Sequence, residues 1–234
     1  MEQRQQYKYY EFVMAAFVIV LICSTLIGPP KVAQLDLPLI GLITLGGGAL
    51  FFPFAYVFGD ILTEVYGYSR ARRVIWAGFA GLAFSSIMAA IVIALPPAPF
   101  WKNQAAFELI FGSTWRIVLA SMFAYFCGEF VNSLVLAKMK ILTQGKHLWS
   151  RTIGSTVVGE AVDSALFYPL AFYGSGLIPD DKLPMVMLAQ FVAKVSVEVL
   201  FTPITYVIVN WLKRAENEDY YDRNTDFNPF HLKA

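Results

Sequence analysis

The sequence predicts an all-α polytopic membrane protein with six transmembrane helices and both termini in the cytoplasm. Hydrophobic residues make up 57% of the 234 residues and charged residues only 15%, whereas about a quarter of the residues in a typical soluble domain are charged. The apolar residues gather in six stretches, each close to the roughly 20 residues that a helix needs to cross a bilayer. We therefore expect one transmembrane domain over residues 1–214 and a polar cytoplasmic tail over residues 215–234.

The six expected helices follow one another with short connections. The first resembles the apolar core of a signal peptide, because Arg4 and Lys8 precede it. Its apolar run is longer than such a core, and Pro29 and Pro30 follow it without a clear small-residue cleavage site, so we expect a retained helix. The expected spans are 11–29, 39–64, 74–95, 115–138, 153–173 and 185–212.

The second expected helix contains residues that weaken helices. Gly46, Gly47, Gly48 and Pro53 interrupt its apolar run, and glycine is too flexible for a helix interior while proline removes a backbone hydrogen bond. A helix broken in this way is tolerated in a membrane where it lines a cavity, often a transporter's binding site. Close packing of helices through small residues is the alternative, and both interpretations stay open.

The distribution of basic residues predicts the orientation. Thirteen of the 18 lysines and arginines fall in the two terminal segments and in the connections after the second and fourth helices, and four fall in the other loops. Because basic residues accumulate on the cytoplasmic side, both termini are expected there. The tail that follows the sixth helix is polar and mixed in charge, so we expect it to be a flexible extension.

A polar pattern recurs inside the expected spans. The stretches 59–64 (GDILTE), 128–133 (GEFVNS) and 159–164 (GEAVDS) each contain a glycine, an acid, two apolar residues and further polar residues. Spacings of three and four residues place the polar side chains of each stretch on one helix face. An ancestral duplication and chance both remain open as the origin. The polar residues that we expect inside spans are Asp60, Glu64, Glu129, Asn132, Glu160, Asp163, Lys194 and Glu198.

These charged groups are too expensive to face lipid. Seven of these eight residues are charged, all except Asn132. A charged residue costs roughly 2.5–3.5 kcal/mol at a helix centre, so the seven would together cost on the order of 15–20 kcal/mol. A folded domain has a net stability of only about 5–15 kcal/mol. The groups must therefore face one another or a hydrated cavity. The alternative for individual residues is a structural role, with Lys194 and Glu198 as an intrahelical pair and the acids near arginines as anchors.

Several functional classes find no support in the sequence. Cys23 and Cys127 lie singly in apolar runs, and His147 and His231 lie outside the spans, so we expect no metal site and no cofactor. No motif of an enzyme active site is present, so we expect no catalytic residues and no enzyme. The net charge of +1 gives no indication of a nucleic-acid partner.

The polar residues favour a ligand with adjacent N–H donors. A carboxylate accepts two parallel hydrogen bonds, so an amidine, a guanidinium or the edge of a guanine would fit. Asn132 and Lys194 could donate to a carbonyl oxygen of such a ligand. Phenylalanine, tyrosine and tryptophan make up 16% of the chain, and one or two of these rings could stack on a flat ligand.

Several stretches resemble the queuosine precursor transporter family, also called the vitamin uptake transporter family. The resemblance covers most of residues 40–214 and is carried by FGDILTEVYGYSRARRVIW, GEFVNSLVLAKMK, WSRTIGSTVVGEAVDSALFYPLAF and KVSVEVLFTPITYVIVNWLKR. It implies a multi-pass importer in the bacterial inner (cytoplasmic) membrane. Its substrates would be 7-deazaguanine precursors of queuosine, the 7-cyano and 7-aminomethyl bases. The family's acidic and amide positions match Asp60, Glu64, Asn132, Glu160 and Asp163, whereas Gly59 stands where we expect a polar residue.

The chemistry of the polar residues and the family resemblance together assign roles to these residues. We expect Glu64, Asn132 and Asp163 to contact the base. Supporting or proton-handling roles are expected for Asp60, Glu160, Lys194 and Glu198, and Glu129 belongs to the same site. The expected partners are the small-molecule substrate and the lipid bilayer, with a homo-oligomer left open. The alternative is a substrate-binding subunit that needs an energising partner, with Arg70, Arg72 and Arg73 or the 138–151 loop as its docking surface.

Overall fold

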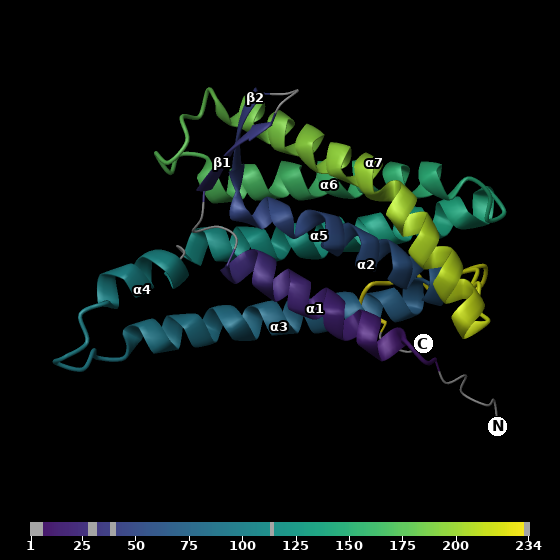
Figure 1. Cartoon of the computed structure of the whole chain (residues 1–234), viewed down its shortest axis with the longest axis horizontal. Helices are drawn as coiled ribbons and strands as arrows, with labels where there is room; N and C mark the ends of the chain where they lie inside the picture. The colour runs from purple at the N-terminus through teal and green to yellow at the C-terminus, as the bar shows by residue number, and fades with distance from the viewer. Residues whose placement is uncertain (1–6, 28–31, 38–40, 113–114, 232–234) are drawn as a thin grey trace.

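The computed structural model describes residues 7–27, 32–37, 41–112 and 115–231 as a mostly helical bundle (Figure 1). This confirms the helical fold class. The helices are α1 (Tyr10–Leu26), α2 (Phe52–Tyr66), α3 (Tyr68–Ala94), α4 (Gln104–Phe111), α5 (Trp115–Leu142), α6 (Leu148–Phe172) and α7 (Leu183–Glu216).

The described helices have the surface of a membrane protein. Three stretches are long and apolar enough to cross a bilayer: α3, the stretch Gln104–Leu142 that includes α5, and α7, while α1 is a shorter apolar helix. Large apolar side chains such as Phe84, Leu200 and Val207 point outward. Acids and bases are buried instead, among them Asp60 and Arg151. An apolar exterior around a polar interior fits a bilayer as the solvent, so the chain is a multi-pass membrane protein.

The second expected span, 39–64, is wrong in its first part. Strands β1 (Val32–Leu37) and β2 (Gly41–Gly46) form an antiparallel hairpin with Val32 opposite Gly46, and a 3₁₀ helix over Gly47–Leu50 follows. The break falls at the glycine run, and α2 begins only at Phe52, with Pro53 in its first turn, where no hydrogen bond is lost. The first two residues of this expected span, and the last two of the first span, lie outside the described residues.

Helix α3 begins six residues before the expected span, at Tyr68 instead of residue 74. Gly67 has a φ of +85°, which only glycine adopts readily, and this residue turns the chain sharply from α2 into α3. The Asp222 carboxylate accepts the Tyr68 N–H at 3.0 Å and so caps the new helix. The expected arginine-rich loop is therefore the first turn and a half of a helix. A further short helix, α4, lies in the expected loop between the third and fourth spans.

Helices α5 and α6 pack side by side through the glycines of the recurring pattern (Figure 1). A Cβ atom on Gly159 would lie only 2.7 Å from the Asn132 Cβ, and one on Gly128 would lie 3.0 Å from the Asp163 Cβ. Neither position has room for a larger residue. The two glycines thus bring the polar faces of α5 and α6 into direct contact.

The tail is folded back onto the bundle, so the expectation of a flexible extension is wrong for the described residues up to 231. The backbone N–H of Tyr220 donates to the Val65 carbonyl at 3.3 Å. The buried Arg72 guanidinium donates to the Asn228 carbonyl at 2.6 Å. Because these partners lie at the same end of the bundle, the tail covers the end opposite the β1–β2 hairpin (Figure 1).

Candidate functional site

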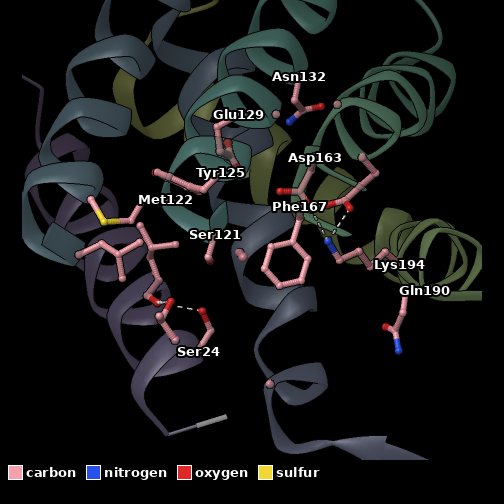
Figure 2. Close-up of a pocket in the computed structure, with 18 of the residues that line it drawn as sticks. Ser24, Ser121, Met122, Tyr125, Glu129, Asn132, Asp163, Phe167, Gln190 and Lys194 are labelled. Atoms are coloured by element: carbon pink, nitrogen blue, oxygen red, sulfur yellow. Dashed lines mark hydrogen bonds and ion pairs between the residues drawn. The ribbon is translucent and has the colours of Figure 1, made fainter. Parts of the chain in front are cut away.

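A cavity of about 560 Å³ lies inside the bundle (Figure 2). It lies in the half that carries the hairpin, because Gly48, just after β2, lines it. Its walls come from α1, α2, α3, α5, α6 and α7, with Ser24 at the end of α1 and Phe172 at the end of α6 marking the hairpin side. Five of the eight predicted site residues line it: Glu129, Asn132, Glu160, Asp163 and Lys194.

One wall carries an ion cluster that joins α6 and α7. The Lys194 ammonium lies 2.7 Å from Glu160 Oε2 and 2.9 Å from Asp163 Oδ2. The Tyr56 hydroxyl of α2 donates to Glu160 Oε1 at 3.0 Å. Lys194 therefore links α7 to α6 through ion pairs between the two helices. One lysine serves two acids, so the cluster keeps an excess of negative charge when all three are ionised.

The other predicted cavity residues belong to α5. Figure 2 shows Glu129 and Tyr125 on one side of the cavity and Lys194 on the other. Among the residues that the structure describes, Glu129 has no hydrogen bond and no salt bridge. The Asn132 Oδ1 and the Tyr125 hydroxyl are buried and also lack a hydrogen-bond partner there. This wall therefore carries polar groups whose hydrogen-bonding capacity is available to a ligand.

Asp60 and Glu198 lie behind the cavity and do not line it. Each is 1% exposed, and the two carboxyl groups are neighbours. A hydrogen bond between these two carboxyl groups requires that one of them carries a proton. Apart from that bond, none of their four oxygen atoms has a hydrogen-bond partner among the described residues. A Cβ atom on the adjacent Gly59 would lie 3.7 Å from Glu129 Oε2, so the departure from the family pattern at this position leaves room beside Glu129.

Glu64 lies outside the cavity, at the end of the bundle that the tail covers. It is fully buried, with Arg151 and Lys213 each 2.7 Å from its Oε1 and Lys140 at 3.6 Å. These contacts match the anchoring role that the sequence left as the alternative for acids near basic residues. Glu64 does not line the cavity with Asn132 and Asp163, the residues with which it was expected to contact the base.

Asp219 of the tail completes this ion cluster. Its Oδ1 lies 2.6 Å from the Lys140 ammonium and 2.8 Å from that of Lys213. Burial raises the pKa of Asp219, but the hydrogen bonds from the two lysines outweigh it and hold the pKa below the ordinary value of an aspartate. The tail is thus bound to the bundle through charge as well as through its backbone.

The sequence interpretation missed Tyr125 and Ser121, which line the cavity from α5. A signal was present, because Ser121, Tyr125 and Glu129 follow one another at intervals of four residues and so share a helix face. The aromatic residues that line the cavity include Tyr56, Phe167 and Tyr168. Rings of these types offer stacking surfaces for a flat ligand.

The arrangement suits binding and not catalysis. The cavity combines carboxylates, one ammonium, hydroxyl groups and aromatic rings, the kind of lining that fixes the orientation of a small polar ligand. In the described parts of the chain, no group of three or more histidine, cysteine or acidic side chains is placed to hold a metal ion.

Comparisons with known proteins agree with a transport function. The family model described as "Putative vitamin uptake transporter" matches residues 46–208. A "Probable queuosine precursor transporter" of Bacillus subtilis is 31% identical over 158 residues, which cover 67% of this chain and 68% of the relative. The "Queuosine precursor transporter" of Escherichia coli is 26% identical over 215 residues, 90% of each chain. No solved structure matches significantly. The chain therefore belongs to the vitamin uptake transporter family and is a transporter, not an enzyme.

Proposed function

We propose that this protein imports 7-deazaguanine precursors of queuosine, the 7-cyano and 7-aminomethyl bases, across the bacterial inner membrane. The observation that carries the proposal is the cavity that combines acidic groups, a lysine and aromatic rings inside the bundle. Its volume of about 560 Å³ falls in the range of about 300–1,000 Å³ that is common for small-molecule sites. The Bacillus subtilis and Escherichia coli relatives are named as transporters of queuosine precursors, the class to which these bases belong.

The chemistry of a deazaguanine fits the groups that line the cavity. Its N1–H and 2-amino group lie side by side, and a carboxylate such as Glu129 or Asp163 accepts two such donors at once. Its carbonyl oxygen needs a donor, which Asn132 or Lys194 can supply. Phe167 offers a flat apolar surface for the ring. In this proposal, Glu160, Lys194, Asp60 and Glu198 keep supporting or proton-handling roles.

The proposed topology has six membrane spans and both termini in the cytoplasm. Under this orientation, the hairpin half of the bundle faces the outside, and the tail and the Glu64 ion cluster face the cytoplasm. The cavity extends toward the hairpin half, while the buried side chain of Glu64 and its cationic partners fill the other end. An importer needs such an outward-directed cavity in the state that accepts its substrate.

Uptake into cells tests the proposal. Cells that cannot make the bases and that lack their own importer should accumulate the labelled bases when they express this chain. The Asp163→Asn variant should lose at least about tenfold in uptake, because it removes a charge that fixes Lys194. Glu108→Gln is the matched control, since Glu108 lies on α4 and does not line the cavity.

Two outcomes would contradict the proposal. Uptake equal to that of cells without the protein would exclude these bases as substrates. Binding by the purified chain without transport in proteoliposomes would instead favour a subunit that needs an energising partner. For such a partner, Arg72 is unsuited as a docking residue, because it is buried and bonded to the tail carbonyls of Asp226 and Asn228.

A further inference from the structure

The charges that line the cavity do not balance when its acids are ionised. Lys194 is the one basic residue among the lining residues that the structure describes, whereas three acids, Glu129, Glu160 and Asp163, line the same space. A cavity partly shielded from water strengthens electrostatic interactions, so this imbalance affects which ligands can enter. A ligand with positive charge would be stabilised there, and a neutral ligand would leave the imbalance in place.

Lys194 is already committed to two of the three acids. It lies within 2.9 Å of both Glu160 and Asp163, and the Tyr56 hydroxyl occupies the second oxygen of Glu160. Both oxygen atoms of Glu160 and one of Asp163 therefore have protein partners. These contacts leave Glu129 as the cavity acid whose carboxylate is wholly available to a ligand.

The surroundings of Glu129 contain acceptors and no cation within ion-pair distance among the described residues. Asn132 is three residues further along the same helix face, and its buried Oδ1 has no hydrogen-bond partner there. The hydroxyl of Tyr125, four residues before Glu129, is likewise buried and unpartnered in the described chain. The carboxyl group of Asp60, which pairs with that of Glu198, interacts electrostatically with Glu129 and brings no positive charge to this wall. The Tyr125 hydroxyl and the Asn132 amide can donate as well as accept. The carboxylate of Glu129 is therefore the group on this wall that only accepts, and it favours a ligand group that only donates.

An ammonium group meets that requirement. It carries three N–H donors and no acceptor, and a hydrogen bond between two charged groups is about twice as strong as one between neutral groups. A nitrile has the opposite character, since its nitrogen only accepts, and it would be repelled by the Glu129 carboxylate. Specificity of this kind combines an attraction for one ligand with a repulsion of its competitor.

We propose that Glu129 determines specificity through an ion pair with a positively charged ligand. The site therefore prefers a planar base with an ammonium-bearing substituent over its neutral nitrile analogue. This inference rests on the proposed import of deazaguanines and names which of the two bases is preferred. Glu129 is the positioned anion that receives the ammonium group. On the facing wall, the ion pairs of Lys194 with Glu160 and Asp163 fix the positions of these three side chains.

Equilibrium binding to the purified full-length protein in detergent tests the inference. The 7-aminomethyl base should bind at least about tenfold more tightly than the 7-cyano base. In Glu129→Gln, which keeps the size of the side chain and removes its charge, the aminomethyl base should lose about tenfold or more in affinity, while the cyano base should bind as before or better. Glu108→Gln on α4 should keep the wild-type ratio of affinities.

A second variant separates a charge effect from a folding defect. Glu129→Asp keeps the charge and should keep the preference for the aminomethyl base, and its size-exclusion profile should match that of the wild type. Equal affinities of the wild type for the two bases would overturn the inference and leave the import proposal intact, as would an unchanged ratio in Glu129→Gln. Equal losses for both bases in both variants would show a purely structural role and would also overturn it. Failure of the wild type to bind either base would refute the import proposal and, with it, this inference.

Discussion

Glu64 shows what a single buried carboxylate does when three cations surround it. Arg151 and Lys213 are each 2.7 Å away, and Lys140 lies at 3.6 Å. The side chains of Arg151 and Lys140 are only 1% and 2% exposed, so water cannot replace the carboxylate as their partner. Their burial is tolerable only while an anion balances them.

Replacement of Glu64 by glutamine should therefore destabilise the protein but leave its affinity for the ligand almost unchanged. Removing one partner from a buried ion pair costs about 3–5 kcal/mol, because the remaining charges stay buried. The measurement is chemical unfolding in detergent, with Glu108→Gln as a control that should not change the midpoint. The dissociation constant for the base should change less than about twofold, since Glu64 does not line the cavity. A variant of normal stability that no longer binds would show instead that Glu64 contacts the ligand.

The placement of Glu64 also shows how far the sequence could predict the site. The spacing of Asp60 and Glu64 correctly implies one helix face, and the cost of charges in lipid correctly implies that both are buried. Four residues along a helix span about 6 Å, however, which is far enough to place Asp60 beside Glu198 and Glu64 in a separate ion cluster. Asp219, which pairs with Lys213 in the same ion cluster, comes from the tail. No periodicity of the sequence connects Asp219 with α2.

At the scale of elements, the close crossing of α5 and α6 forms part of the cavity wall, because Gly128, Asn132, Gly159 and Asp163 all line the cavity. Gly128 lies against Asp163, and Gly159 lies against Asn132, so two of the three glycines of the recurring pattern each pack against a site residue on the other helix. The sequence showed the pattern but not the reason for it. The glycines precede the acids because close helix contact is needed next to the polar faces.

Substitution of Gly159 by alanine should disturb the site through packing alone. The added Cβ would lie 2.7 Å from the Asn132 Cβ and 3.3 Å from its Cα, so backbone would have to move. Overpacking of this kind costs about 1–3 kcal/mol, and affinity for the base should fall as Asn132 shifts. Gly154→Ala on the same helix is the matched control, because its Cβ would meet only the flexible end of Met139. Equal effects of the two substitutions on binding would contradict a special role for the crossing.

The break before α2 was foreseeable, but its form was not. Glycines and Pro53 indicate where a helix is weak, and the structure breaks the helix there. The formation of a strand at Gly41–Gly46 depends on pairing with Val32–Leu37, a contact between segments that the sequence interpretation had assigned to a loop and a helix. Tertiary pairing overrides a helical pattern here, as strand formation depends strongly on context.

At the scale of the whole molecule, the two ends of the bundle differ. The cavity occupies the hairpin half, whereas the tail end is filled by buried ion pairs and by the tail itself. Asp219 binds Lys140 and Lys213, Asp222 caps α3, and Arg72 holds the tail carbonyls of Asp226 and Asn228. Transport across a membrane requires the closed end to open at some stage. The tail contacts are then among the interactions that must be broken.

Removal of residues 218–234 should therefore loosen the tail end of the bundle. Ser133 is a suitable reporter, because it is 2% exposed, follows Asn132 directly and bonds to Thr63 at 3.1 Å. In a background without Cys23 and Cys127, Ser133→Cys should react slowly with a thiol reagent in the full chain and at least about tenfold faster after truncation, because local opening no longer costs the tail contacts. Gln144→Cys, at an exposed turn of the same end, should react equally fast in both proteins. Unchanged reactivity of the buried cysteine would mean that the helices alone keep this end closed, and that the tail is bound to a structure that does not need it.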